Sequence, residues 1–195
     1  MEGKKREKVM SLEMVLLGTI VILLIAQTLF SILNFHGVQQ LKAFFRNENT
    51  SVLANEFQEL IDKEMIDVEL IDEQGGSASL ESLIENSTIL VFSNHSCHAC
   101  QTLYPELKEF SRNNQEVRII LITSNTPEEN NIFLNGDKDI VSLGWKVMTG
   151  NRHAFDVYHI SGTPTLVFID EKGFIRNIGY ASSKSQIVEL IYNRP

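Results

Sequence analysis

TILVFSNHSCHACQTLYPEL, residues 88–107, contains the clearest structural signal in this chain. Its first five residues form a continuous run of apolar and β-branched side chains, which is typical of a strand buried on both faces. From Gln101 onward the apolar residues recur at helical spacing, so a helix is predicted over residues 101–111. The motif Cys97-His98-Ala99-Cys100 therefore stands where a buried strand passes into a helix.

That placement predicts redox chemistry for the two cysteines. At a helix N-terminus, the helix dipole and the unpaired N–H groups stabilise a thiolate, so Cys97 is expected to be the exposed nucleophile. Cys100 lies one turn further in, and is expected to be more buried and to resolve a mixed disulfide. The spacing allows a Cys97–Cys100 disulfide. A charged His98 would lower the thiol pKa further, although a histidine that simply faces solvent is an equal alternative.

Cysteine usage restricts the alternatives. The chain has only two cysteines, so a structural zinc site and a scaffold of several disulfides are both excluded. Gln101 after Cys100 excludes a C-x-x-C-H haem attachment motif. A redox pair, which needs no cofactor and no metal, is the main interpretation. The alternative is a Cu(I) metallochaperone that uses the same cysteines, with His159 as a weak candidate for a third ligand.

The flanking sequence predicts an α/β fold. Alternation and apolar runs predict strands, Gly-containing segments predict turns, and helical spacing predicts helices. A sheet covered by helices on both faces follows from this order of elements. The predicted strands are residues 67–72, 88–92, 117–123, 165–170 and 174–180, with a short extended piece at Val147; the predicted helices are residues 77–84, 101–111, 151–158 and 183–192, with another that begins near Pro127.

Pro164 comes directly before one of these buried strands. A proline in such a position is often cis and fixes a turn, so we expect a cis Thr163–Pro164 bond that faces Cys97.

The N-terminal region predicts a membrane anchor. Residues 14–33 contain no charged side chain, and a helix of about 20 residues crosses a bilayer core of about 30 Å. Basic residues precede this stretch, so residues 1–13 are expected to be a cytoplasmic tail, residues 14–35 a single transmembrane helix, and the rest extracytoplasmic. A cleaved signal peptide is the alternative, but the apolar stretch is long and no small-x-small cleavage site follows it. Residues 36–66 are interpreted as a juxtamembrane stalk.

The formal net charge of -8 argues against a nucleic-acid partner, because phosphate binding needs a basic surface.

Together, residues 67–195 resemble thioredoxin. The resemblance is carried by the strand–CxxC–helix unit, the Thr163-Pro164-Thr165 loop, the following hairpin and the final helix. With its anchor, the chain is similar to the membrane-anchored TlpA/ResA-like group, and more specifically to the methylamine-dehydrogenase accessory (MauD-type) thioredoxin-like proteins, in which a small hydroxyl residue precedes the first cysteine. Ser96 fills that position here. Val91 stands where thioredoxin has a buried acid.

The resemblance implies a thioredoxin-like fold, a mixed central sheet with helices on both faces. It also implies a thiol–disulfide oxidoreductase in which Ser96, His98, Thr163 and Pro164 border the two cysteines. Its partner would be an exported cysteine-containing protein, whose disulfides it forms, reduces or isomerises, and a membrane thiol-redox protein would recycle the pair.

Overall fold

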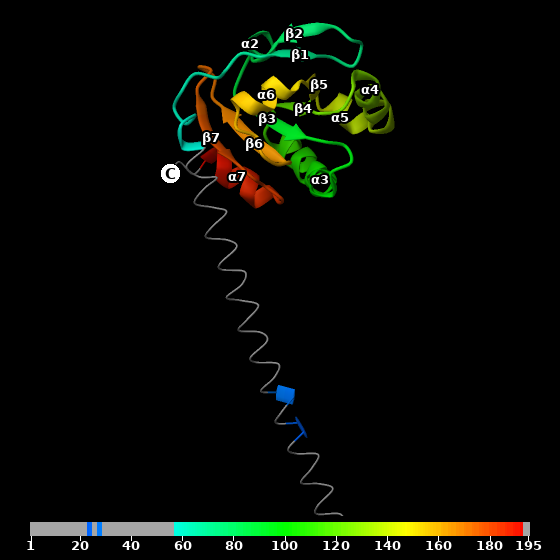
Figure 1. The fold of residues 1–195 in the computed structure, drawn as a ribbon, viewed down its shortest axis with the longest axis vertical. Helices are drawn as coiled ribbons and strands as arrows, with labels where there is room; N and C mark the ends of the chain where they lie inside the picture. The colour runs from blue at the N-terminus through cyan, green and yellow to red at the C-terminus, as the bar shows by residue number, and fades with distance from the viewer. Residues whose placement is uncertain (1–22, 25–26, 29–56, 193–195) are drawn as a thin grey trace, which may run out of the picture. The chain divides into compact units, whose positions relative to one another are not determined.

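A seven-stranded mixed sheet organises the part of the chain that the computed structural model describes, which is residues 23–24, 27–28 and 57–192 (Figure 1). The order across the sheet is β2-β1-β5-β4-β3-β6-β7. The strands are β1 (Glu69–Ile71), β2 (Ser77–Ser79), β3 (Thr88–Ser93), β4 (Arg118–Thr123), β5 (Lys146–Gly150), β6 (Thr165–Ile169) and β7 (Ile175–Gly179). Strands β3, β4 and β5 run parallel, whereas the remaining pairings are antiparallel.

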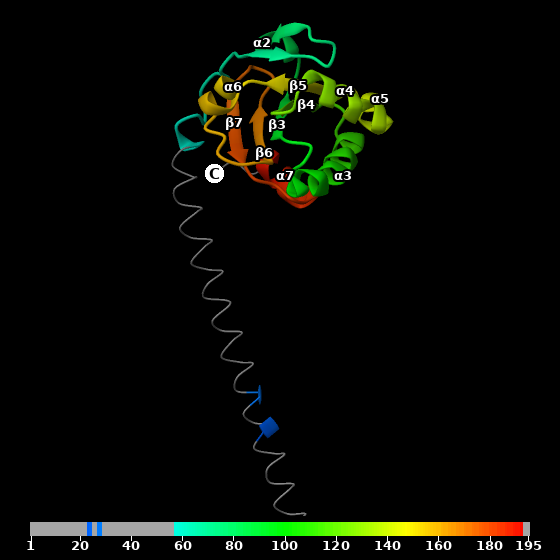
Figure 2. The same ribbon diagram turned by 45° about the vertical axis from the view of Figure 1, so that its right-hand side comes forward.

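Helices cover both faces of this sheet, as the sequence predicts. They are α2 (Leu80–Leu83), α3 (His98–Asn113), α4 (Pro127–Gly136), α5 (Lys138–Ser142), α6 (Arg152–Val157) and α7 (Lys184–Tyr192). Helices α3 and α7 pack on one face, and α2 and α6 pack on the other. Figure 2 shows α3 and α6 on opposite sides of the sheet.

Alternation along β3 divides the interior into two cores. Ile89 and Val91 point into the core under α3, while Leu90 and Phe92 point into the core under α6, and all four are fully buried. The strand thus buries both faces, which explains why its sequence is a continuous apolar run.

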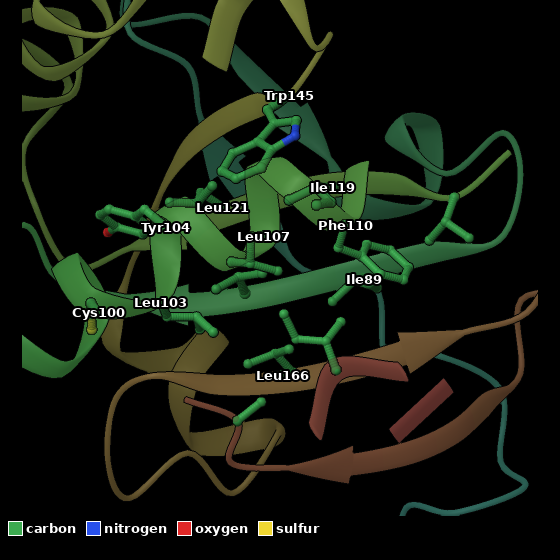
Figure 3. Close-up of a cluster of buried hydrophobic side chains, with 14 of the residues drawn as sticks. Ile89, Cys100, Leu103, Tyr104, Leu107, Phe110, Ile119, Leu121, Trp145 and Leu166 are labelled. Atoms are coloured by element: carbon green, nitrogen blue, oxygen red, sulfur yellow. The ribbon is translucent and has the colours of Figure 1, made fainter. Parts of the chain in front are cut away.

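The core under α3 fixes the position of Cys100. The side chains of Cys100, Leu103, Leu107 and Phe110 follow one another along the buried side of α3 (Figure 3). Full burial of each large apolar side chain contributes about 1.5–3 kcal/mol. Cys100 therefore lies at the N-terminal end of the row of buried side chains that packs α3 against the sheet, and its side chain is held away from solvent.

The predicted helix over residues 77–84 is wrong in its first turn. Ser77–Ser79 form strand β2, paired with β1 through contacts such as Leu70 with Ala78. The hairpin closes because the Asp72 carboxylate accepts hydrogen bonds from the N–H groups of Gln74 and Gly76.

The N-terminus of α2 is capped from outside the helix. Ser79 occupies the N-cap position, but its side chain makes no capping bond. The Asp67 carboxylate instead accepts the N–H of Glu81 at 2.9 Å and the Ser79 hydroxyl at 2.8 Å. A side chain from before β1 therefore satisfies the open end of the helix.

The packed domain begins before Asp67. Phe57 and Leu60 are buried in the core under α6. The N–H of Met65 bonds to the carbonyl of Gly173 at 2.8 Å, and Asp62 pairs with Arg176 of β7. The predicted stalk over residues 36–66 is therefore wrong for residues 57–66, which are held against the turn and strand that follow β6; residues 36–56 lie outside the described residues.

The predicted anchor, residues 14–35, falls outside the described residues except for Leu23, Leu24, Gln27 and Thr28, which are helical. Within residues 23–24, 27–28 and 57–192, no helix combines the length and the apolar character needed to cross a bilayer.

Candidate active site

Cys97 occupies the N-cap of α3. Its backbone is extended, with φ −76° and ψ 114°, and its sulfur accepts the N–H of Cys100 at 3.2 Å. The Cys97 N–H in turn donates to the carbonyl of Asn94 at 3.0 Å. The helix begins at His98, three residues earlier than predicted, so its first unpaired N–H groups surround the Cys97 sulfur.

The loop before β6 brings a second group to this sulfur. The Thr163–Pro164 bond is cis, as predicted, and the Cys97 thiol donates to the Thr163 carbonyl at 3.5 Å. Because β6 is antiparallel to β3, the start of β6 and the end of β3 lie at the same edge of the sheet. Residues 66 positions apart in the sequence therefore meet at one point.

The two thiols, which are both free in this structure, are electrostatically unequal. Burial acts to raise the pKa of Cys97, but hydrogen bonds with the Cys100 thiol and the Thr163 side chain, and from the backbone N–H groups of Cys100 and Ala99, outweigh it and lower that pKa below its ordinary value. Burial, followed by the hydrogen bond with Cys97, raises the pKa of Cys100 to about 11. One sulfur is therefore poised as a nucleophile while its neighbour keeps its proton.

His98 and Ser96 border the cysteines but are exposed. The His98 side chain forms no hydrogen bond with the residues that the structure describes, and it is not among the principal causes of the Cys97 pKa shift. Ser96 donates from its hydroxyl and its N–H to the Asn94 carboxamide oxygen, so it shapes the loop before Cys97.

No carboxylate is among the groups that shift the pKa of Cys100. Val91 is fully buried on the same side of the sheet, and the nearby Glu106 is used elsewhere, since its carboxylate accepts the Lys184 N–H at the start of α7. Tyr104 lies one turn after Cys100, is buried, and donates its hydroxyl to Ser93 at 3.2 Å (Figure 3). Burial raises the pKa of Tyr104 to about 12, which keeps its hydroxyl protonated at neutral pH and leaves no phenolate to act as a base.

Two polar residues, one near the cysteines in the sequence and one in α4, are joined by a hydrogen bond. Asn130 lies in the polar run Glu128–Asn131 of α4, yet its side chain is completely buried. His95 is half-buried and bonds to it through Nε2 at 2.8 Å. No local pattern marks this pair, because it depends on α4 packing against β5 and on hydrogen bonds of the Asn130 side chain with Thr123 of β4 and Thr149 of β5.

Two further histidines among the described residues lie away from such contacts. His153 and His159 are exposed, and His159 adopts a left-handed backbone at the end of α6, with φ 55°. Among the residues that the structure describes, no group of three or more His, Cys, Asp and Glu side chains could hold a metal ion.

The unequal thiols lead to a testable expectation. In the reduced protein, alkylation of Cys97 by iodoacetamide should rise with pH with a midpoint below the ordinary thiol value of about 8.5. Cys100 should stay unmodified until the pH approaches about 11. Peptide mass spectrometry after short exposure at each pH measures both sites. Equal labelling of the two cysteines at neutral pH would contradict the geometry, and His98→Ala, which alters an exposed ring, should change the midpoint little.

Comparisons with known proteins agree with this arrangement. The family model described as AhpC/TSA family matches residues 61–178. The methylamine utilization protein MauD of Paracoccus versutus is 27% identical over 123 residues, which are 63% of this chain and 60% of that protein; the chain thus spans less than two thirds of that relative.

Solved structures share the fold. A putative thiol-disulfide oxidoreductase from Bacteroides vulgatus superposes with a TM-score of 0.59 at 18% identity, covering 70% of this chain and 97% of that one. A thiol:disulfide interchange protein from Bacteroides sp. gives a TM-score of 0.55 at 19% identity, covering 66% and 88%. These likenesses confirm the predicted thioredoxin-like fold.

Proposed function

Because this chain belongs to the AhpC/TSA family of thioredoxin-like proteins, we propose that it is a thiol–disulfide oxidoreductase whose redox-active pair is Cys97 and Cys100. One observation carries the proposal most directly. The Cys97 sulfur sits at the N-terminus of α3 between the Cys100 N–H and the Thr163 carbonyl, with its pKa lowered while that of Cys100 is raised. This is an attacking thiol next to a resolving thiol.

In the reductive direction, the Cys97 thiolate attacks one sulfur of a partner disulfide. The partner's S–S bond breaks, its other sulfur leaves as a thiolate and takes up a proton, and a Cys97–partner mixed disulfide forms. Cys100 then attacks the Cys97 sulfur, and its proton passes to the departing partner sulfur, which leaves as a thiol while a Cys97–Cys100 disulfide forms. Two electrons pass from the pair to the partner, and the same steps in reverse oxidise a dithiol.

The proposal extends to where this chemistry takes place. The uncharged stretch of residues 14–33 and the basic residues before it support a single-pass anchor with a cytoplasmic N-terminus and an extracytoplasmic catalytic domain. The substrate would then be an exported cysteine-containing protein, and a membrane thiol-redox protein would restore the pair. The curated relatives are named methylamine utilization proteins, and our proposal includes a role in the maturation of one specific partner protein.

Cys100→Ser tests the function directly. Attack by Cys97 survives in this variant but resolution does not, so mixed disulfides with the natural partner should accumulate. They should appear as reductant-sensitive, higher-mass species on non-reducing gels, and mass spectrometry would identify the trapped protein. The double variant Cys97→Ser/Cys100→Ser is the matched control and should trap nothing. If Cys100→Ser traps nothing either, and the unaltered protein purifies with stoichiometric copper, the oxidoreductase proposal fails.

Topology has its own test. A reporter that is active only outside the cytoplasm, fused after Pro195, should be active, because the basic residues before Met14 favour a cytoplasmic N-terminus. Removal of that charge bias by Lys4→Glu, Lys5→Glu and Arg6→Glu should reduce the active fraction. An inactive fusion with the unaltered N-terminus, paired with an active cytoplasmic reporter at the same site, would overturn the proposed location.

A further inference from the structure

His95, two residues before Cys97, is held from several directions at once. Its backbone N–H donates to the Asn125 side-chain oxygen at 2.8 Å, and its ring Nε2 lies 2.8 Å from the Asn130 side-chain oxygen. Its ring stacks on Phe133 of α4, with centroids 4.0 Å apart and planes 19° apart. Together these contacts fix both its backbone and its ring.

The bonding of Asn130 determines which form of the imidazole is present. Its Nδ2 donates to the Thr149 hydroxyl at 2.9 Å, and its Oδ1 accepts the Thr123 hydroxyl at 2.9 Å. The atom that faces His95 is the same Oδ1, which can only accept. The Nε2 of His95 must therefore carry the hydrogen, and Nδ1 keeps a bare lone pair.

Protonation of that lone pair is unfavourable in this setting. Nδ1 is buried and has no hydrogen-bond partner among the described residues, so a proton there would add a charge and a donor without an acceptor. Burial lowers the pKa of His95, against smaller opposing effects of Asn130 and of the Glu129 carboxylate, which is the charged group facing it from α4. The imidazole is thus neutral at neutral pH.

The loop that carries His95 also determines where Cys97 lies. The Asn94 carbonyl accepts the Cys97 N–H, and the Asn94 side chain donates to the Ser124 hydroxyl at 2.8 Å. On the other side, the Gln101 side chain in the first turn of α3 donates to the His95 carbonyl at 2.8 Å. The loop is therefore tied both to the β4–α4 connection and to α3, and His95 supplies its link to the buried network.

We propose that His95 is a positioning residue of the active site. As a neutral Nε2–H donor to Asn130, it holds the loop that sets the Cys97 sulfur at the N-terminus of α3, and its protonation in acid loosens this hold. The inference rests on the proposed function only in taking Cys97 as the nucleophile.

Three variants of the full-length chain distinguish the effect of the Nε2–H hydrogen bond from the effect of ring packing. His95→Leu keeps an apolar side chain against Phe133 but removes the donor, which leaves Asn130 Oδ1 with Thr123 alone. His95→Gln restores an N–H at the Nε2 position and cannot titrate. His153→Leu, at an exposed histidine, is the matched control.

The readout is the rate of Cys97 alkylation by iodoacetamide as a function of pH, together with circular dichroism as a check of folding. His95→Leu should move the midpoint to higher pH and reduce the rate at pH 7 by at least about threefold, since the thiolate fraction falls as the thiol pKa rises. His95→Gln and His153→Leu should match the unaltered protein at pH 7. Below the ordinary histidine pKa of about 6.5, the Cys97 alkylation rate of the unaltered protein should fall with decreasing pH more steeply than the titration of one thiol allows. The rate of His95→Gln should follow the titration of one thiol alone.

An unchanged midpoint in a folded His95→Leu variant would overturn the proposal. So would a His95→Gln variant as impaired as His95→Leu, because the ring stack and not the donor would then be responsible. If His95→Leu does not fold, the alkylation rates of the unaltered protein and of His95→Gln below about pH 6.5 decide the question. The same pH dependence in both proteins would contradict the proposal. A shifted midpoint in a protein that traps no partner would leave His95 in its role and refute only the oxidoreductase function.

Discussion

Cys97→Ser should lower the rate of thiol–disulfide exchange by at least about a thousandfold, to the uncatalysed background, because the attacking thiolate is lost and a hydroxyl does not replace it at neutral pH. The Cys97 sulfur receives the hydrogen bond of the Cys100 N–H and faces the Thr163 carbonyl, and no other described cysteine has such an environment. An insulin reduction assay measures the loss. The dithiol form reduces insulin disulfides, a second reductant restores the dithiol, and the rise in turbidity gives the rate.

Cys100→Ser provides the comparison for this prediction. It keeps the lowered Cys97 pKa in outline, because the backbone N–H of residue 100 is retained and a serine hydroxyl can donate to the Cys97 sulfur in place of the Cys100 thiol. A single-turnover assay should therefore still show attack by Cys97, followed by arrest as a mixed disulfide, whereas Cys97→Ser should show neither step. Residual exchange above a few per cent in Cys97→Ser would mean that Cys100 attacks by itself, against its raised pKa and its complete burial.

Phe92→Ala should destabilise the domain by about 3–5 kcal/mol, a large part of the roughly 5–15 kcal/mol that holds a typical domain folded. The Phe92 side chain is fully buried in the core under α6. Its ring meets the edge of Phe155 with centroids 5.2 Å apart and lies 5.4 Å from the ring of Tyr158. Truncation removes both aromatic contacts and leaves a cavity between β3 and α6.

Urea unfolding followed by circular dichroism gives the size of this effect. Phe92→Leu, which fills more of the space, should cost distinctly less than Phe92→Ala. The folded fraction of either variant should keep its Cys97 alkylation midpoint, because Phe92 faces away from α3. A loss below about 1 kcal/mol for Phe92→Ala would show that this core repacks freely, contrary to the density expected of protein interiors.

The central elements of the fold could be predicted because their sequences are locally consistent. Strand β3 is apolar on both faces, and α3 repeats its apolar residues at helical spacing. Strands β2 and β5 were harder, because the sequence of β2 is Ser-Ala-Ser and β5 is a short, mixed segment. Each segment is a strand only because of the strands it pairs with. Strand β2 pairs with β1, and β5 pairs with β4 and β1. These partners cannot be recognised from the sequence of the segment itself.

The site divides in a similar way. The cysteine pair and Pro164 are marked by spacing and by their position next to buried strands, so a single sequence reveals them. Asn130 and His95 come together across 35 positions, and Asn130 lies in a run of polar residues that is typical of an exposed helix. Its burial follows from the way α4 packs on the sheet, which no local pattern contains.

The antiparallel pairing of β6 with β3 also sets the order in which the protein matures during synthesis. Phe92 of β3 pairs with Thr165 of β6, so both cysteines leave the ribosome long before the residues that will face them. Contacts at such sequence separations form late, because loop closure must precede their gain in stability. A nascent chain that ends before β6 would lack the Thr163 contact with Cys97, so the asymmetry between the two thiols is complete only when the C-terminal strands join the sheet.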